Sequence, residues 1–181
     1  MIPLIRSVST ACLLAVLPLA VSAACPPLLN EQMKTLEGKP LDLCQFEGKA
    51  ILVVNTASTC GFTPQFDKLE GMYKQYQDRG LVVLGFPSND FRQELASNQE
   101  VGDFCRMTYG VKFPMAEKSS VTGEAANPFF KRLADATLDP PTWNFHKYLI
   151  APDGKTVYSF ASGVAPDSEQ VMSKLQPMLK K

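Results

Sequence analysis

This sequence has no net charge, a single histidine and few long apolar runs. Among its 181 residues, Lys plus Arg and Asp plus Glu number 18 each, and no block of like charges occurs. A chain without net charge has no general attraction to nucleic acid or anionic membranes, so we expect neither as a partner. His146 is the single histidine and there is no Cys-x-x-Cys pair. This disfavours a metal site and a disulfide reductase that works through such a pair.

The amino-terminal segment, residues 1–24, is typical of a secretory signal peptide. It has a cation at Arg6, an apolar run over 11–20 and small side chains before Cys25. The apolar run is too short to cross a hydrocarbon core of ~30 Å, so we expect no membrane span. Two alternatives stay open: an uncleaved anchor, or cleavage that exposes Cys25 for acylation as in a lipoprotein. We expect an exported, periplasmic protein whose mature chain, residues 25–181, is a single domain.

Five cysteines are present, and Cys12 falls within the predicted signal peptide. The other four, Cys25, Cys44, Cys60 and Cys105, are an even number, and thiols tend to pair in an oxidising compartment. Because Cys25 and Cys44 flank a predicted hairpin, we hypothesise a structural disulfide that ties the N-terminal segment to the sheet. Acylation of Cys25 would instead leave Cys44 free.

Hydrophobic periodicity predicts an α/β domain. β-Branched apolar runs predict strands, and apolar residues at helical spacing predict helices. Along the chain we expect a hairpin of 33–35 and 40–43, a strand over 50–56, a helix over 65–77, a strand over 81–86, helices over 98–109 and 128–136, a hairpin of 145–150 and 156–161, and a helix over 168–179. This order implies a central mixed sheet flanked by helices, the thioredoxin-like fold, with an N-terminal β-hairpin.

Cys60 is the strongest candidate for chemistry. It follows the predicted strand over 50–56 and precedes Thr63 and Pro64, which we predict to be the N-cap and first residue of the next helix. Ligands of open α/β sheets bind beyond the carboxyl ends of the strands, and a helix N-terminus offers unpaired N–H groups and a positive dipole. Both favour the thiolate, the nucleophilic form of cysteine. We therefore predict a reactive thiol rather than a buried structural cysteine.

Three ordered segments resemble the signatures of the glutathione peroxidase family. They are Val-Val-Asn-Thr-Ala-Ser-Thr-Cys-Gly-Phe-Thr at 53–63, Leu-Gly-Phe-Pro-Ser-Asn-Asp-Phe at 84–91 and Trp-Asn-Phe at 143–145. The resemblance covers about residues 36–180. It implies a thiol peroxidase that reduces hydrogen peroxide and organic hydroperoxides in oxidative-stress defence, and no cofactor is expected.

The resemblance also implies a catalytic tetrad of Cys60, Gln93, Trp143 and Asn144. The two amides and the indole N–H are neutral donors. Aimed at sulfur, they hold a thiolate without supplying a competing base, and they can bind the departing hydroxide. The chain departs from the family pattern at 91–96, where Phe-Arg-Gln-Glu-Leu-Ala is one residue shorter and lacks a Pro-Gly. Gln93 is therefore expected in a reshaped loop.

Cysteine-type members of the family place a resolving cysteine in the helix that here contains Cys105. In the implied cycle, peroxide oxidises Cys60 to a sulfenic acid, Cys105 condenses with it to a disulfide, and a thioredoxin-like protein or glutathione reduces that disulfide. Two cysteines bond only when their α-carbons lie within ~7 Å, so we predict local unwinding around Cys105. A buried helical cysteine without a redox role is the alternative. The chain lacks the long insertion of the tetrameric, glutathione-using members, which favours a monomer and a protein dithiol donor.

Other functions on the same fold make different demands. A peroxiredoxin would place Thr three residues before the cysteine, where this chain has Ala57. An exported copper chaperone or redox-binding protein would use a cysteine pair and a histidine. We expect no catalytic role for His146, because strand alternation puts it on the face opposite Phe145. A binding protein would also consume peroxide only once per molecule.

Overall fold

The computed structural model describes residues 24–181, so the predicted signal peptide lies outside the described residues except for Ala24. Within the described part, no helix is long and apolar enough to cross a membrane. Strands, helices and short 3-10 helices (η) follow one another as β1 (Gln32–Lys34), β2 (Pro40–Asp42), η1 (Leu43–Phe46), β3 (Ala50–Thr56), α1 (Gln65–Tyr76), η2 (Gln77–Arg79), β4 (Leu81–Pro87), α2 (Asn98–Tyr109), α3 (Pro128–Thr137), β5 (Lys147–Ile150), β6 (Val157–Phe160), α4 (Glu169–Leu175) and η3 (Gln176–Met178).

The main sheet has the strand order β4-β3-β5-β6. β3 pairs with β4 in parallel and with β5 antiparallel, while β5 and β6 form an antiparallel hairpin. β1 and β2 form a separate antiparallel hairpin. β3 and β4 are buried along their whole length, as expected for apolar strands that are covered on both faces. The predicted mixed sheet and N-terminal hairpin are confirmed.

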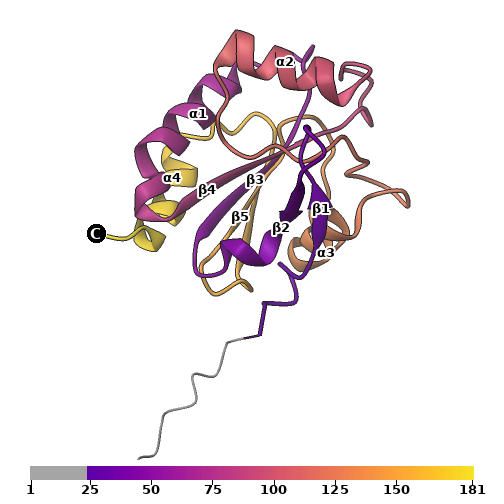
Figure 1. Ribbon diagram of the computed structural model, residues 1–181. Coiled ribbons are helices and arrows are strands. Elements are labelled where there is room, and N and C mark those ends of the chain that lie inside the picture. Colours follow the sequence, from indigo (N-terminus) through magenta and orange to yellow (C-terminus); the bar gives the residue numbers. More distant parts are fainter. Residues whose placement is uncertain (1–23) are drawn as a thin grey trace, which may run out of the picture.

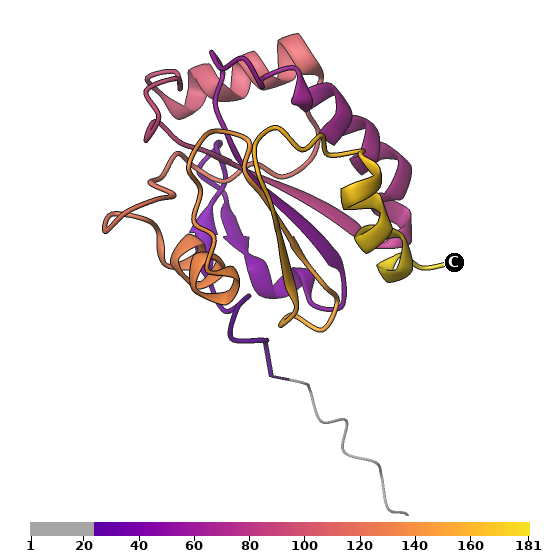
Figure 2. The same cartoon turned by 180° about the vertical axis from the view of Figure 1, so that it is seen from behind.

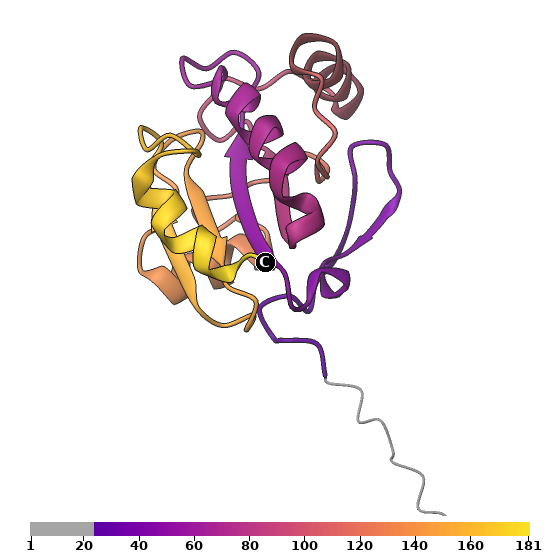
Figure 3. The ribbon, with the colours of Figure 1, turned by 90° about the vertical axis from the view of Figure 1, so that its left-hand side faces the viewer.

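Alternate residues of β3 face two separate apolar clusters, because successive side chains of a strand point to opposite faces. Leu52 and Val54 belong to the cluster that packs against α1, α2 and α4. Ile51 and Val53 belong to the cluster that packs against α3. In Figures 1 and 2, α1 and α4 lie on one side of the sheet and α3 on the other, while α2 crosses the end of the sheet. Figure 3 shows α1 and α4 together from their own side.

The start of α1 differs from the prediction. Its N-cap is Pro64, which makes no side-chain capping bond, so Thr63 is not the cap. The Thr63 hydroxyl instead accepts the Cys60 N–H at 3.0 Å and donates to the Ala57 carbonyl at 2.9 Å. These two bonds engage the hydroxyl with the preceding loop rather than with the helix N-terminus. The predicted cap residue therefore shapes the loop that holds Cys60.

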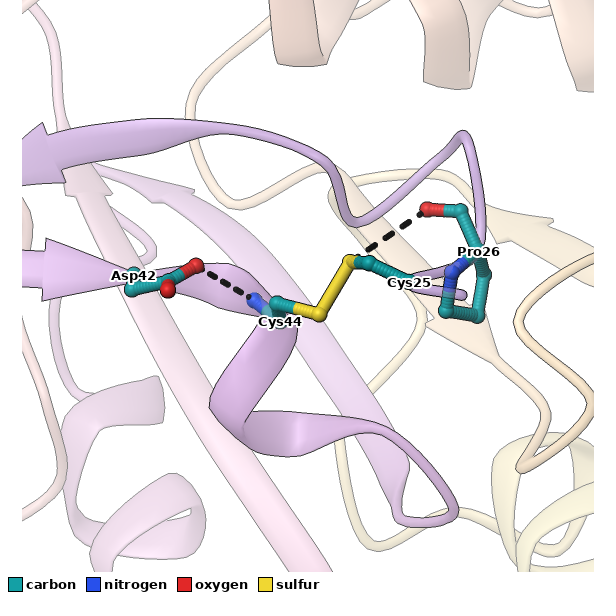
Figure 4. Close-up of a disulfide and its surroundings, with 4 residues drawn as sticks. All are labelled: Cys25, Pro26, Asp42 and Cys44. Carbon is teal, nitrogen blue, oxygen red and sulfur yellow. Dashed lines mark hydrogen bonds between the residues drawn. A yellow bond between two sulfur atoms is a disulfide. The ribbon is translucent and has the colours of Figure 1, made fainter. Parts of the chain in front are cut away.

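The hypothesised disulfide between Cys25 and Cys44 is confirmed (Figure 4). Their α-carbons lie 5.6 Å apart, and the bridge spans a sequence separation of 19. The Asp42 carboxylate accepts the Cys44 N–H at 2.9 Å and caps η1. The bridge thus fastens the N-terminal segment to the turn between β2 and β3.

Removing this bridge should lower the free energy of unfolding. For a loop of this length the chain-entropy account gives a loss of about 3 kcal/mol. Urea unfolding of Cys25→Ser/Cys44→Ser measures it, with the wild type in excess reductant as the matched control. The reduced wild type should unfold at the variant's urea midpoint, and the variant should not respond to reductant. Equal unfolding free energies for variant and oxidised wild type would contradict the prediction.

Candidate active site

Cys60 lies in the loop between β3 and α1, with 7% of its surface exposed. The backbone N–H of Phe62 points at its Sγ over 3.4 Å. The Thr63 N–H donates to the Cys60 carbonyl at 3.0 Å and so closes a turn ahead of α1. A donor aimed at sulfur favours negative charge on it. The loop therefore provides the setting that a nucleophilic thiol requires.

Gln93 lies between the Cys60 loop and the third predicted segment. Its carbonyl accepts the Thr59 N–H at 3.0 Å and the Thr59 hydroxyl at 2.7 Å. Its side-chain Oε1 accepts Nδ2 of Asn144 at 2.9 Å. Just before it, Arg92 has a φ of +58°, a left-handed conformation that is uncommon outside glycine. The shortened loop turns there and keeps Gln93 against both neighbours.

Asn55 of β3 holds the backbone of the Trp-Asn-Phe segment. Its Nδ2 donates to the Trp143 carbonyl at 3.1 Å, and its carbonyl accepts the Phe145 N–H at 2.6 Å. Phe145 has a φ of +62°, so the strand predicted from 145 begins instead at Lys147. The left-handed turn presents Asn144, which is fully buried, to Gln93.

Trp143 is the exposed member of the group, with 42% of its surface accessible. Its ring packs beside Phe91, with ring centroids 5.4 Å apart. A path of contacts thus runs from the Cys60 loop through Gln93 to Asn144 and the adjacent Trp143. The structure brings the segments of the four predicted residues together at one end of the sheet.

Glu94 also belongs to this region, although no motif in the sequence marks it. Its Oε1 accepts the Ser58 N–H at 3.0 Å and the Leu95 N–H at 2.8 Å. Burial raises the pKa of this carboxyl, and the two hydrogen bonds oppose the rise. Its place directly after Gln93 is the only signal in the sequence. The carboxylate joins the Cys60 loop to the segment that leads into α2.

Cys105 is a buried free thiol in α2, in the same apolar cluster as Cys60. Burial, and secondly the charge of Glu94, raise the pKa of Cys105 to about 12. Within α2 this sulfur is therefore held as the thiol, which is a poor nucleophile. Beside it lies a pocket of about 280 Å³, whose lining includes Leu36, Gly102 and Met115.

His146 lies on the other face of the sheet, as predicted. Its ring packs against Tyr148 at 4.8 Å, and its Nε2 lies 2.8 Å from the Ser159 hydroxyl, which donates to Asp139 at 2.7 Å. Burial lowers the pKa of His146. Among residues 24–181, no group of three or more His, Cys, Asp or Glu is placed to hold a metal ion.

Comparison with known proteins identifies the family. Residues 28–134 match the family model of glutathione peroxidase. The chain belongs to the glutathione peroxidase family. A glutathione peroxidase-like peroxiredoxin of Chlamydomonas reinhardtii is 44% identical over 158 residues, covering 82% of this chain and 98% of the relative. The thioredoxin/glutathione peroxidase BtuE of Escherichia coli is 35% identical over 179 residues, 85% of this chain and 98% of the relative.

Solved structures agree with this glutathione peroxidase assignment. The crystal structure of T. cruzi GPX1 superposes with a TM-score of 0.66 at 28% identity, covering 83% of this chain and 95% of that one. The thioredoxin-like fold is thereby confirmed. This glutathione peroxidase is an oxidoreductase that acts as a thiol peroxidase, and a binding protein without turnover on the same fold is not favoured.

Proposed function

We propose that the chain reduces hydroperoxides through a two-cysteine cycle. The Cys60 thiolate attacks one peroxide oxygen, the O–O bond breaks, and the departing alkoxide or hydroxide leaves as alcohol or water after taking up a proton. Cys60 becomes a sulfenic acid. The Cys105 thiol then displaces water from it to form the Cys60–Cys105 disulfide, and a dithiol donor reduces this disulfide by exchange.

The main support for this active site is that Gln93 contacts both the Cys60 loop and Asn144. The backbone of Gln93 fixes the Cys60 loop through Thr59, and its side chain fixes Asn144. One residue thus sets the position of both the nucleophile loop and the buried amide. In this role Gln93, Trp143 and Asn144 are neutral donors around the sulfur and the departing oxygen.

Opening of α2 is part of the proposed cycle, because Cys105 is held as a buried thiol within the helix. The ion pairs of Arg106 in α2 are exposed: it pairs with Glu37 outside the helix and with Asp103 within it, at 2.8 Å each, and all three side chains are about half exposed. Such pairs contribute only about 0–1 kcal/mol each. These ion pairs would therefore add little to the cost of opening the helix locally, and opening would free Cys105 from the burial that raises its pKa.

We infer a thioredoxin-like dithiol as the donor and export as the destination. The Escherichia coli relative is named for both thioredoxin and glutathione, so both donors belong in the test. The disulfide between Cys25 and Cys44 and the predicted signal peptide support an oxidising compartment such as the periplasm. We further propose that the mature chain acts as a monomer.

Two measurements test this cycle. NADPH-coupled turnover with hydrogen peroxide is compared between a thioredoxin system and a glutathione system, and we expect faster turnover with thioredoxin. Faster turnover with glutathione would reverse the donor assignment. One equivalent of peroxide followed by peptide mapping should yield a Cys60–Cys105 linked peptide. Without that peptide, Cys105 does not resolve.

Asn144→Ala should slow peroxide reduction by about 10²-fold, the usual loss when one donor to a developing anion is removed. The variant also leaves Gln93 without its side-chain donor. The rate of oxidation by hydrogen peroxide under single-turnover conditions measures the effect. Asn127→Ala is the matched control, because it removes the N-cap of α3 and costs about 1 kcal/mol of stability. A similar rate loss in both variants would assign the effect to stability.

A further inference from the structure

Lys147 is a fully buried lysine whose hydrogen-bond partners are all neutral. Its Nζ donates to the Phe145 carbonyl at 2.5 Å, to Oε1 of Gln65 at 2.8 Å and to the Ser162 carbonyl at 3.3 Å. A lysine ammonium has three N–H donors, so three oxygen acceptors match the charged form. A neutral amine has only two N–H donors and could serve two of these oxygens, of which the Ser162 carbonyl also accepts Nε2 of Gln65 at 2.8 Å.

Two of the three contacts connect the segments that form the two sides of the site. Phe145 directly follows Asn144, and Gln65 opens α1 immediately after the turn that contains Cys60. Lys147 lies opposite Val54 of β3, on the sheet face whose apolar cluster includes Cys60. The ammonium therefore links the turn that presents Asn144 to the helix that follows the nucleophile.

A purely structural role accounts poorly for a charge at this position. Burying a cation without an anionic partner is costly, and an apolar residue of the same volume is often more stable. The same low-dielectric setting makes a buried charge act strongly on other charges nearby. A thiolate on the same face of the sheet would gain from this field.

Other charged groups around Lys147 do not neutralise it. Lys68 of α1 and Asp167, beyond Ser162, pair with each other at 2.7 Å and are about half exposed. His146 lies on the opposite face of the sheet, and the positive charge of Lys147 contributes to lowering its pKa. Burial lowers the pKa of Lys147 to about 7. The amine of Lys147 is therefore protonated and positively charged below neutral pH, and it loses its proton as the pH rises through about 7.

We propose that Lys147 is a positioning residue that holds the Asn144 turn against α1 and whose buried positive charge favours the thiolate form of Cys60. The proposal rests on the proposed function in one respect. The charge on Lys147 affects peroxide reduction only if Cys60 is the residue that attacks the peroxide. Its effect on the thiol itself can be measured without peroxide.

The test is the rate of Cys60 alkylation by iodoacetamide between pH 5 and 9. It uses the Cys105→Ser background, in which Cys60 is the only free thiol of the described chain. Lys147→Met, which keeps the length of the side chain, should react at least about tenfold more slowly at pH 6, because the ammonium is lost. The two rates should converge as the pH rises, since Lys147 itself loses its proton above about 7. Lys68→Met, the loss of an exposed lysine of α1, should stay within about twofold of the parent throughout.

A second variant keeps the test decisive if Lys147→Met does not fold. Gln65→Leu leaves Lys147 in place but removes one acceptor of its ammonium, so alkylation should slow in the same direction between pH 6 and 8. If the variant that folds shows the same alkylation rates as the parent at every pH, the proposal is wrong. A loss of alkylation rate that is equal at every pH would also overturn it. A wild type that lacks peroxide turnover but shows the Lys147-dependent profile would refute the proposed function alone.

Discussion

Cys60→Ser should reduce hydroperoxide consumption by at least about 10³-fold, because a serine hydroxyl is hardly ionised at neutral pH and is a weak nucleophile without an adjacent base. No histidine lies on this side of the sheet to act as that base, since His146, the only histidine in the chain, faces the other way. The coupled assay with thioredoxin measures the loss. A single-turnover trace from Trp143, the only tryptophan, should lose its peroxide-dependent phase.

The fold of this variant should be intact. Serine is close in size to cysteine, and the backbone N–H of Cys60 keeps its bond to Thr63. We expect its free energy of unfolding in urea to stay within about 1 kcal/mol of the wild type. Turnover above a tenth of the wild-type rate in a folded Cys60→Ser protein would contradict Cys60 as the nucleophile. Loss of folding would call for Cys60→Ala with the same readouts.

Elements with a strong local signal could be predicted from the sequence. The strand over 50–56 and the helix over 98–109 have the predicted bounds, because a continuous apolar run and a Gly110 C-cap mark them locally. The N-cap of α1 could not be assigned in the same way. Thr63 has the chemistry of a cap, but its hydroxyl bonds to Cys60 and Ala57 in the preceding loop. Local propensity was overridden by a loop contact that only the folded chain reveals.

The site, too, was predictable only in part. The sequence motifs identified Gln93 and Asn144 as site residues, but the hydrogen bond between them joins residues 51 positions apart and could not be predicted. The sequence of the shortened loop also does not indicate that Arg92 adopts the left-handed backbone conformation that keeps Gln93 in this bond. Lys147 did leave a signal, a cation within a predicted apolar strand. Its partner Gln65 lies 82 positions away, so only the fold shows that its charge is buried and bonded to the first residue of α1.

Cys105→Ser separates the two halves of the cycle and has the second large expected effect. Oxidation of Cys60 by the first equivalent of peroxide should stay within about threefold of the wild-type rate, because Cys105 is held as a neutral buried thiol in α2 before turnover. Steady-state turnover with thioredoxin should fall at least about 10²-fold, since no intramolecular disulfide can form for the donor to attack.

Intact mass spectrometry distinguishes this outcome from a damaged site. The Cys105→Ser protein should accumulate Cys60 sulfenic acid with one equivalent of peroxide and sulfinic acid with excess, because nothing traps the first product. The matched control is Met107→Ser, which changes an exposed side chain of the same helix and should keep wild-type turnover. Full thioredoxin-dependent turnover in Cys105→Ser would mean that the donor attacks the sulfenic acid directly. In that case opening of α2 would have no part in catalysis, and the burial of Cys105 would be purely structural.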